Sequence, residues 1–138
     1  MPAKAKVLEL EFNVSAPPAE VYAAWMSSKK HTAMTGGAAE IQPRVGGRFS
    51  AWDGYIQGET LELERGKRVV QSWRTTDFGP KEPDSKLEVH FLASGRTTRV
   101  RFLHHGLSAA ARRKYKEGWV DFYVEPMQAY FAARSAKS

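Results

Sequence analysis

Aromatic side chains are the residues of this sequence that are best suited to bind another molecule. Phenylalanine, tyrosine and tryptophan make up 12% of its 138 residues. Such rings can fill an ordinary core, or they can line a partly open apolar cavity that holds a ligand. The sequence leaves both interpretations open for Phe49, Trp52, Tyr55, Trp73, Phe91, Phe102, Trp119, Phe122, Tyr123, Tyr130 and Phe131.

A ligand cavity would also need flexible apolar side chains and a few polar groups. Met34 and Met127 fit the first role, and Gln71, Ser50 or His104 could orient a ligand by hydrogen bonding. Burial of apolar ligand surface, at about 25 cal/mol per Å², would supply the binding energy. We therefore predict a cavity lined by Met34, Phe49, Trp52, Trp73, Phe91, Phe102, His104, Trp119, Tyr123 and Met127.

Signatures of catalysis and of metal binding are missing from the sequence. It has no cysteine, no G-x-S-x-G elbow, no P-loop, no G-x-G-x-x-G turn and no H-x-x-x-H pair. Most acidic residues alternate outward along predicted strands, where a carboxylate has no reason to acquire a catalytic pKa. We predict no catalytic residue, no metal ion and no cofactor, and His104 is the one candidate for an inward acid or base.

The N-terminal part of the chain predicts a strand followed by one or two short helices. Apolar and polar residues alternate strictly over Val7–Val14, as in a half-buried antiparallel strand. The prolines after Ser15 suit the first turn of a helix, with Ser15 as its N-cap. We expect this helix to end near Lys29–Lys30 and a second helix or loop to stop at Gly36–Gly37.

The middle of the chain predicts a meander of strands. From Ala38 to His105, turns that contain glycine or proline separate short runs of β-branched and aromatic residues. We expect six strands here and seven in all, joined as hairpins. Alternation in the last two runs places Phe91 and Phe102 on the face that would meet a helix, with His104 pointing the same way.

The last segment predicts a long helix that covers the sheet. Apolar residues recur at helical spacing through Ser108–Arg134, but Gly118 costs about 1 kcal/mol relative to alanine and Pro126 removes one hydrogen bond. We expect the helix to begin near Lys114–Gly118 and to bend at Pro126. The element order predicts an α+β fold, in which a curved antiparallel sheet of about seven strands wraps around the C-terminal helix.

Length and charge narrow the range of functions. The 138 residues predict one domain, residues 1–138, with flexible tails at 1–6 and 135–138. A net charge of +6 is scattered along the chain, so we expect no nucleic-acid partner. No segment has the apolar length of a signal peptide or a membrane span. We expect a cytoplasmic protein without a membrane partner, either a monomer or a weak homodimer.

Several motifs, taken in order, resemble the C-terminal domain of the activators of the heat-shock protein 90 ATPase. The segment Val69–Arg74 is similar to the V-Q-x-W-R strand of that family, and Gly118–Trp119 resembles the Gly-Trp pair that opens its closing helix. The remaining similar segments are Thr35–Pro43, Val45–Phe49, Asp53–Glu59 and Tyr123–Met127.

This resemblance implies the helix-grip fold of the START-like (SRPBCC, Bet v-like) superfamily. Members hold hydrophobic small molecules between sheet and helix, and some are polyketide cyclases or aromatases. The eukaryotic activators carry an additional N-terminal domain, for which we expect no room before the first strand here. The sequence also has His31–Met34 where many bacterial relatives have a W-W pattern, which implies a different pocket mouth.

Three functional hypotheses follow. The first is non-enzymatic binding of a small hydrophobic or aromatic molecule between the sheet and the C-terminal helix. The second is a co-chaperone-like interaction module in stress response, whose basic charge would suit the acidic surface of a heat-shock protein 90 type chaperone. The third is an enzyme of the polyketide cyclase or aromatase kind, which would depend on His104.

Overall fold

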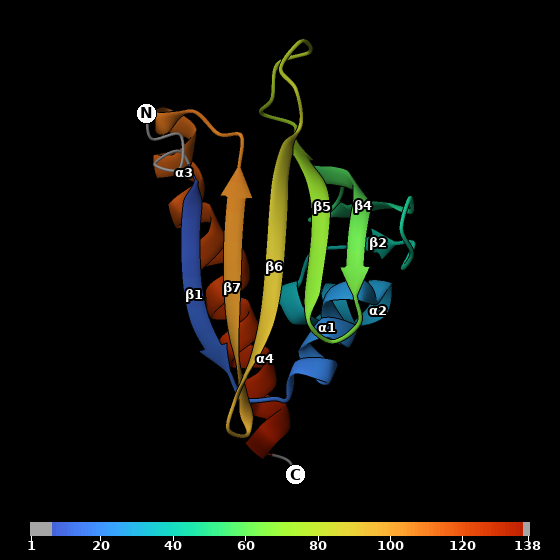
Figure 1. The fold of residues 1–138 in the computed structure, drawn as a ribbon, viewed down its shortest axis with the longest axis vertical. Coiled ribbons are helices and arrows are strands. Elements are labelled where there is room, and N and C mark those ends of the chain that lie inside the picture. The colour runs from blue at the N-terminus through green and yellow to red at the C-terminus, as the bar shows by residue number, and fades with distance from the viewer. Residues whose placement is uncertain (1–6, 137–138) are drawn as a thin grey trace.

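Antiparallel strands form a single sheet in the computed structural model, which describes residues 7–136. Within those residues the sheet has seven strands in the order β1-β7-β6-β5-β4-β3-β2, and every neighbouring pair except β1–β7 is consecutive in sequence (Figure 1). The strands are β1 (Leu8–Val14), β2 (Glu40–Ile41), β3 (Arg48–Ala51), β4 (Ile56–Glu64), β5 (Arg68–Thr75), β6 (Ser85–Ser94) and β7 (Thr97–His105).

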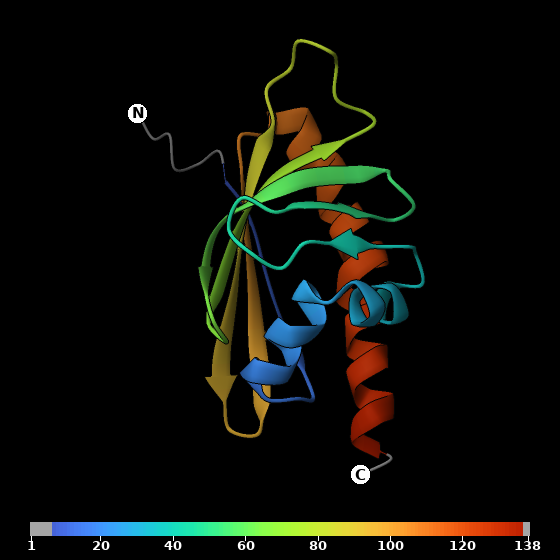
Figure 2. The same ribbon diagram turned by 90° about the vertical axis from the view of Figure 1, so that its right-hand side faces the viewer.

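Helices cover the concave side of this sheet. Two short helices, α1 (Pro18–Met26) and α2 (Ser28–Thr35), follow β1. The C-terminal helical rod consists of α3 (Ala109–Trp119), a π-helical turn η2 (Val120–Val124) and α4 (Glu125–Ala136). Figure 2 shows the rod running along the sheet while β3, β4 and β5 curve over its upper half. The predicted α+β class, the seven strands and the long closing helix are confirmed.

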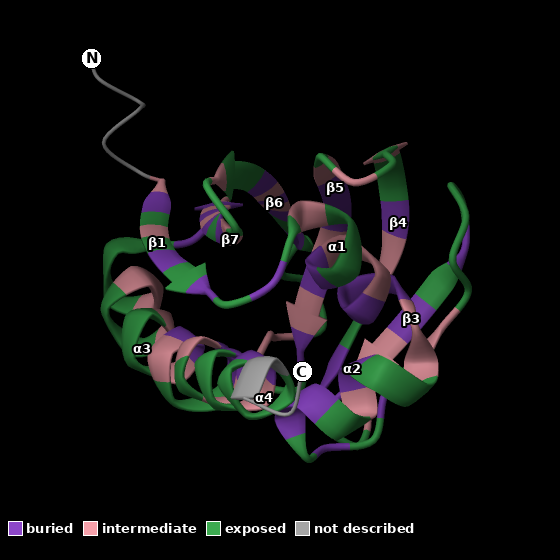
Figure 3. Ribbon diagram, turned by 90° about the horizontal axis from the view of Figure 1, so that it is seen from below, coloured by how far each residue is buried: buried purple, intermediate pink, exposed green. Residues whose placement is uncertain are grey.

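Side chains alternate across the sheet as the sequence predicts. In β1, Phe12 and Val14 are buried while Glu9 and Glu11 are exposed. In β7, Phe102 and His104 are buried on the same face. Seen from below, exposed residues lie on the outer side of the rod and buried ones face the strands (Figure 3). Period-two patterning therefore sets which face of each strand enters the core.

The two short helices differ from the prediction in their limits. The N-cap of α1 is Pro17 and not Ser15, and the helix ends at Met26. Ser27 begins the next helix because its side-chain oxygen accepts the backbone N–H of Lys30 at 3.1 Å. This cap interrupts the segment in which we expected one helix to continue to Lys29–Lys30. Gly36 ends α2 in a left-handed conformation, with φ of 89°.

The C-terminal helix begins earlier than predicted. Ser108 caps α3 by accepting the backbone N–H of Ala111 at 3.1 Å, so the helix starts at Ala109 and includes Gly118. In the π-helical turn, the N–H of Glu125 donates to the carbonyl of Val120. This wider turn lies directly before Pro126, and the helix continues past that residue.

The expected tails are only partly described by the structure. Residues 1–6 and 137–138 lie outside the described residues. Helix α4 extends through Ala136, and the flexibility of residues 135–138 stays a prediction. Within residues 7–136, no helix is long and apolar enough to cross a membrane.

Aromatic rings from both layers meet at the centre of the core. The ring centroid of Trp119 lies 4.6 Å from that of Phe102 and 5.1 Å from that of Trp73. Trp25 of α1 packs on Tyr123 at 5.2 Å. Aromatic pairs at this spacing contribute about 0.5–1.5 kcal/mol beyond the burial of their surface. The helical rod is therefore fixed to the sheet by rings over its first half.

Gly58 of β4 should be the glycine of the sheet that is least tolerant of a side chain. A Cβ atom there would lie 2.0 Å from the carbonyl oxygen of Ser72 and 2.6 Å from the ring of Phe49. We expect Gly58→Ala to lower the free energy of unfolding by about 1–3 kcal/mol or more, measured by urea denaturation. Gly79→Ala, whose Cβ would meet no atom within 4 Å, should change it by less than about 0.5 kcal/mol. Equal effects of both substitutions would contradict this close approach.

Candidate functional site

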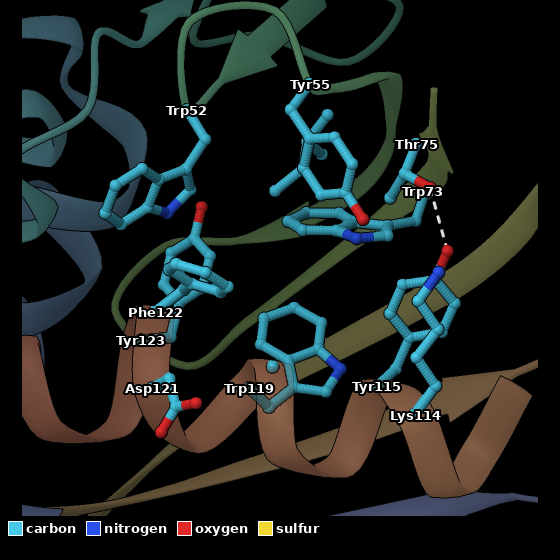
Figure 4. A pocket seen from close by; sticks show the side chains of 12 residues that line it. Trp52, Tyr55, Trp73, Thr75, Lys114, Tyr115, Trp119, Asp121, Phe122 and Tyr123 are labelled. Atoms are coloured by element: carbon cyan, nitrogen blue, oxygen red, sulfur yellow. Dashed lines mark hydrogen bonds between the residues drawn. The ribbon is translucent and has the colours of Figure 1, made fainter. Parts of the chain in front are cut away.

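A pocket of about 470 Å³ lies between the first half of the helical rod and the turn that joins β3 to β4. Ligand pockets in proteins usually measure about 300–1,000 Å³, so its size suits a small molecule. Figure 4 shows aromatic rings on both sides of it. Its lining residues are Trp52, Tyr55, Ile56, Trp73, Thr75, Lys114, Tyr115, Gly118, Trp119, Asp121, Phe122 and Tyr123.

The helical rod supplies the wall of the pocket through residues spaced three and four apart. Trp119 and Tyr123 are buried and form the inner part of this wall, whereas Phe122 is 48% exposed. Gly118 also lines the pocket. Apart from its two chain neighbours and the helix backbone, a Cβ atom built on it would meet no atom closer than Cδ2 of Phe122 at 4.0 Å. The missing side chain of Gly118 therefore leaves space in the pocket.

The β3–β4 turn supplies the opposite wall in an unusual backbone conformation. Trp52 and Asp53 have φ of 50° and 59°, a left-handed region that bulky residues rarely adopt. Two hydrogen bonds between Asp53 and Ala38 hold the turn. The backbone N–H of Asp53 donates to the carbonyl of Ala38, and the backbone N–H of Ala38 donates to the carboxylate of Asp53. A Cβ atom on Gly37 would lie 2.5 Å from the indole of Trp52. Glycine at 37 thus allows the indole to pack against the backbone.

A hydrogen-bonded cluster closes one end of the pocket. The carboxylate of Asp77 accepts the hydroxyl of Tyr55 at 2.5 Å and the ammonium of Lys114 at 2.9 Å. These two bonds, that of Tyr55 foremost, lower the pKa of Asp77. The hydroxyls of Thr75 and Tyr115 form a further bond of 2.8 Å. The cluster joins the β3–β4 turn, the segment after β5 and helix α3 around the pocket.

His104 is a satisfied core residue and not an open polar group. It is 1% exposed. Its Nδ1 atom accepts the indole N–H of Trp119 at 3.1 Å, so the neutral ring carries its proton on Nε2 and donates to Ser85 Oγ at 2.8 Å. Burial lowers the pKa of His104 to about 3. Both ring nitrogens are engaged and neither faces the pocket, so His104 is poorly placed for acid–base catalysis on a bound molecule.

His31 forms a second neutral anchor for the helical rod. Its Nδ1 atom lies 2.9 Å from the carbonyl of Trp25, which can only accept, so Nδ1 carries the proton. Its Nε2 atom then accepts the hydroxyl of Tyr123 at 2.9 Å. Burial lowers the pKa of His31 to about 4 and raises that of Tyr123 above its usual value. Both groups are neutral near pH 7.

The structure brings together some of the residues predicted to line a cavity. Trp52, Trp73, Trp119 and Tyr123 line the pocket described above. That they contact a ligand remains a prediction.

Other predicted lining residues lie elsewhere. Phe49 lines a second, smaller hollow of about 340 Å³ together with polar side chains. The remaining ones pack inside the core, from the inward face of the sheet and from helices α2 and α4; they are Met34, Phe91, Phe102, His104 and Met127. Of the polar groups expected to orient a ligand, Gln71 bonds Trp25 and Thr60 in the core, and Ser50 lines the second hollow.

Several pocket residues are absent from the predicted lining, although Tyr55 and Phe122 are among the rings that the sequence left open as core or cavity residues. Tyr115, Gly118 and Phe122 share one helical stripe with Trp119, which is the signal that could have placed them together. Tyr55 and Thr75 carried no comparable signal, because strand alternation does not show where a sheet edge leaves its inner face uncovered. Among residues 7–136, no group of His, Cys, Asp or Glu side chains is arranged to hold a metal ion.

A curved antiparallel sheet that grips a long C-terminal helix, with an apolar pocket at their junction, defines a helix-grip protein. The crystal structure of an HSP90 activator from Plasmodium falciparum has this fold, with a TM-score of 0.83 at 22% identity over 92% of this chain and 96% of that one. The family model described as "Activator of Hsp90 ATPase homolog 1-like protein" matches residues 15–132. The chain belongs to this family, which confirms the predicted resemblance.

Longer relatives contain this domain as a part. An activator of 90 kDa heat shock protein ATPase homolog from Dictyostelium discoideum is 29% identical over 115 residues, which are 83% of this chain and 30% of that protein. The chain thus spans about a third of the length of the curated relatives it matches. The solution structure of the Aha1 dimer from Colwellia psychrerythraea shares the fold, with a TM-score of 0.77 at 14% identity over 91% of this chain and 95% of that one.

Stability should fall as the pH drops below 6.5, the unperturbed pKa of histidine. The folded protein keeps His31 and His104 neutral down to about pH 4 and about pH 3, so the unfolded chain binds protons first. The stability that the neutral forms contribute is complete above pH 6.5 and is lost on acidification. The loss reaches at most about 1.4 kcal/mol per pH unit for each side chain. Urea denaturation near pH 7 and near pH 5 measures it.

The variant that tests this assignment is His31→Gln. Replacement of His31 should reduce the slope of stability against pH, because the side chain of glutamine does not bind a proton in this range. An unchanged slope in the His31 variant would contradict this assignment.

Proposed function

We propose that the protein binds a small apolar molecule with aromatic character, without catalysis, in the pocket between the sheet and the C-terminal helix. One observation carries the proposal: aromatic rings wall an open pocket of about 470 Å³ instead of filling it. Each 100 Å² of apolar ligand surface removed from water contributes roughly 2.5 kcal/mol. Association itself costs about 4–15 kcal/mol, so a ligand must contact most of the rings to bind.

Substitution of Gly118 tests this function by filling the pocket. Gly118→Phe places a ring where the structure leaves space, and it should weaken binding of the neutral fluorescent probe N-phenyl-1-naphthylamine by about tenfold or more. The measurement is a fluorescence titration, in which the wild-type protein should bind one probe per chain. Native mass spectrometry of freshly purified protein should in addition reveal any co-purified small molecule.

Two variants of the same helix serve as controls. Gly118→Ala should keep probe binding and raise the free energy of unfolding by up to about 1 kcal/mol, because alanine favours the helix. Ala110→Phe adds the same ring at an exposed position outside the pocket lining and should leave the affinity unchanged. Equal affinity of the wild-type and Gly118→Phe proteins would refute binding at this pocket.

A second candidate function is interaction with a heat-shock protein 90 type chaperone. Membership of the activator family and the name of the Dictyostelium discoideum relative favour it. A net charge of +6 would draw the protein to an acidic chaperone surface and make binding sensitive to salt.

An ATPase assay with the heat-shock protein 90 type chaperone from the same organism tests this second proposal. Addition of the protein should raise the chaperone's ATPase rate at low ionic strength, and the effect should shrink in high salt as surface charges are screened. The Gly118→Phe variant should act like the wild type, because the proposed contact depends on surface charge and not on the pocket. An unchanged ATPase rate together with no binding in a pull-down would remove the proposal.

A further inference from the structure

The indole nitrogen of Trp52 is the one buried side-chain polar atom without a hydrogen-bond partner in the described part of the chain. Two other buried tryptophans have partners, since Trp25 donates to Gln71 at 3.0 Å and Trp119 donates to His104 at 3.1 Å. An unpaired buried donor costs about 1–3 kcal/mol, and such groups usually have a reason to persist. The edge of Trp52 that carries this nitrogen is turned toward the other lining side chains (Figure 4).

Phe122 packs against this indole from the opposite wall. The two ring centroids are 5.0 Å apart and the rings meet edge to face, at 65°. A ring face is at most a weak substitute for a hydrogen-bond acceptor. Phe122 is also 48% exposed and comes from the π-helical turn, so it has fewer neighbours to hold it than the buried rings beside it. Its exposure leaves this ring less packing to lose on moving than the buried rings beside it.

The position of Trp52 carries a conformational cost. A bulky residue at φ of 50° is strained by about 1–3 kcal/mol unless surrounding contacts enforce it. Here the bonds between Asp53 and Ala38 and the bare backbone of Gly37 enforce it. The fold therefore holds a hydrogen-bond donor at the pocket and provides no acceptor for it.

The charges around the pocket favour an uncharged ligand. Lys114 is the one cationic side chain of the lining, and it is paired with Asp77 at 2.9 Å. Asp121 adds a carboxylate to the lining, and no ion pair or hydrogen bond within residues 7–136 engages its side chain. An anion would lack a free counter-charge among the lining side chains of this pocket.

We propose that the pocket takes a neutral aromatic carbonyl compound, whose oxygen replaces the Phe122 ring as the partner of the Trp52 indole N–H. This inference rests on the proposed function, because it names the chemistry of the ligand in the same pocket. Trp52 acts as the specificity-determining residue and Phe122 covers its donor when the pocket is empty. The buried ring walls supply affinity, and the single hydrogen bond selects ligands with an acceptor at the matching position.

Two probes of nearly equal shape test the hydrogen bond. 2-Acetylnaphthalene carries a carbonyl oxygen, and 2-isopropenylnaphthalene has a CH₂ group in its place. Competition against N-phenyl-1-naphthylamine gives the affinity of each. The wild-type protein should prefer the ketone by about threefold to tenfold, the range of one net hydrogen bond. Trp52→Phe should abolish this preference, whereas Tyr115→Phe, which removes a lining hydroxyl already bonded to Thr75, should keep it.

A measurement on the unaltered protein avoids dependence on the folding of the variant. The protein has four tryptophans, so the indole N–H region of its ¹⁵N–¹H spectrum is simple. The Trp52 resonance should move downfield with the ketone and much less with the alkene. The Trp25 and Trp119 resonances, whose N–H groups already have partners, should move little.

The possible results separate this inference from the proposed function. If both probes bind equally and the Trp52 resonance does not respond, the pocket binds ligands but the carbonyl assignment is wrong. If neither naphthalene binds, the proposed function itself fails. Tighter binding of 2-naphthoate than of the ketone would overturn the neutral character of the ligand.

Discussion

Two uncharged histidine side chains hold the C-terminal helix to the rest of the fold. His104 of the sheet accepts the indole N–H of Trp119, and His31 of α2 accepts the hydroxyl of Tyr123. Each bond requires a neutral ring with its proton on the far nitrogen, and each far nitrogen has its own acceptor, Ser85 or the carbonyl of Trp25. Loss of either histidine would leave a buried donor unpaired. The position of the helix thus depends on histidines that the surrounding core keeps neutral.

This anchoring divides the pocket into a fixed and a loosely held part. Trp119 and Tyr123, four residues apart, bond to the histidines and belong to the closely packed core. Phe122, between them in sequence, lines the same pocket but is half exposed. The π-helical turn at Val120–Val124 begins directly after the first anchor and includes the second. Neighbouring residues of one turn therefore differ in how firmly they are held.

The fold was largely predictable because it depends on patterns that repeat. Alternation in β1 and β7 identified the inward faces of Phe12, Phe102 and His104, and the glycine turns separated the strands. Alternation identifies the inward face of a strand, but it does not show how deeply each residue on that face is buried. Residues in the closed core, such as Phe91 and Phe102, could therefore not be distinguished from Trp52, which lines the open pocket. The start of the closing helix was misplaced because Gly118 was judged by helix propensity alone. Packing of Trp119 against the sheet outweighs that propensity.

Features that no local pattern predicts all lie at the pocket. Gly118 weakens the helix, Trp52 adopts a left-handed backbone and the regular hydrogen-bond ladder widens at Val120–Val124. A chain selected for stability alone would place alanine at 118 and glycine at 52, since both changes relieve a local cost. Departures from local preference that gather around one cavity are expected where a protein trades stability for a binding site. The core supplies the stability that such a site requires. Its aromatic rings pack against one another, and its buried histidines are hydrogen-bonded.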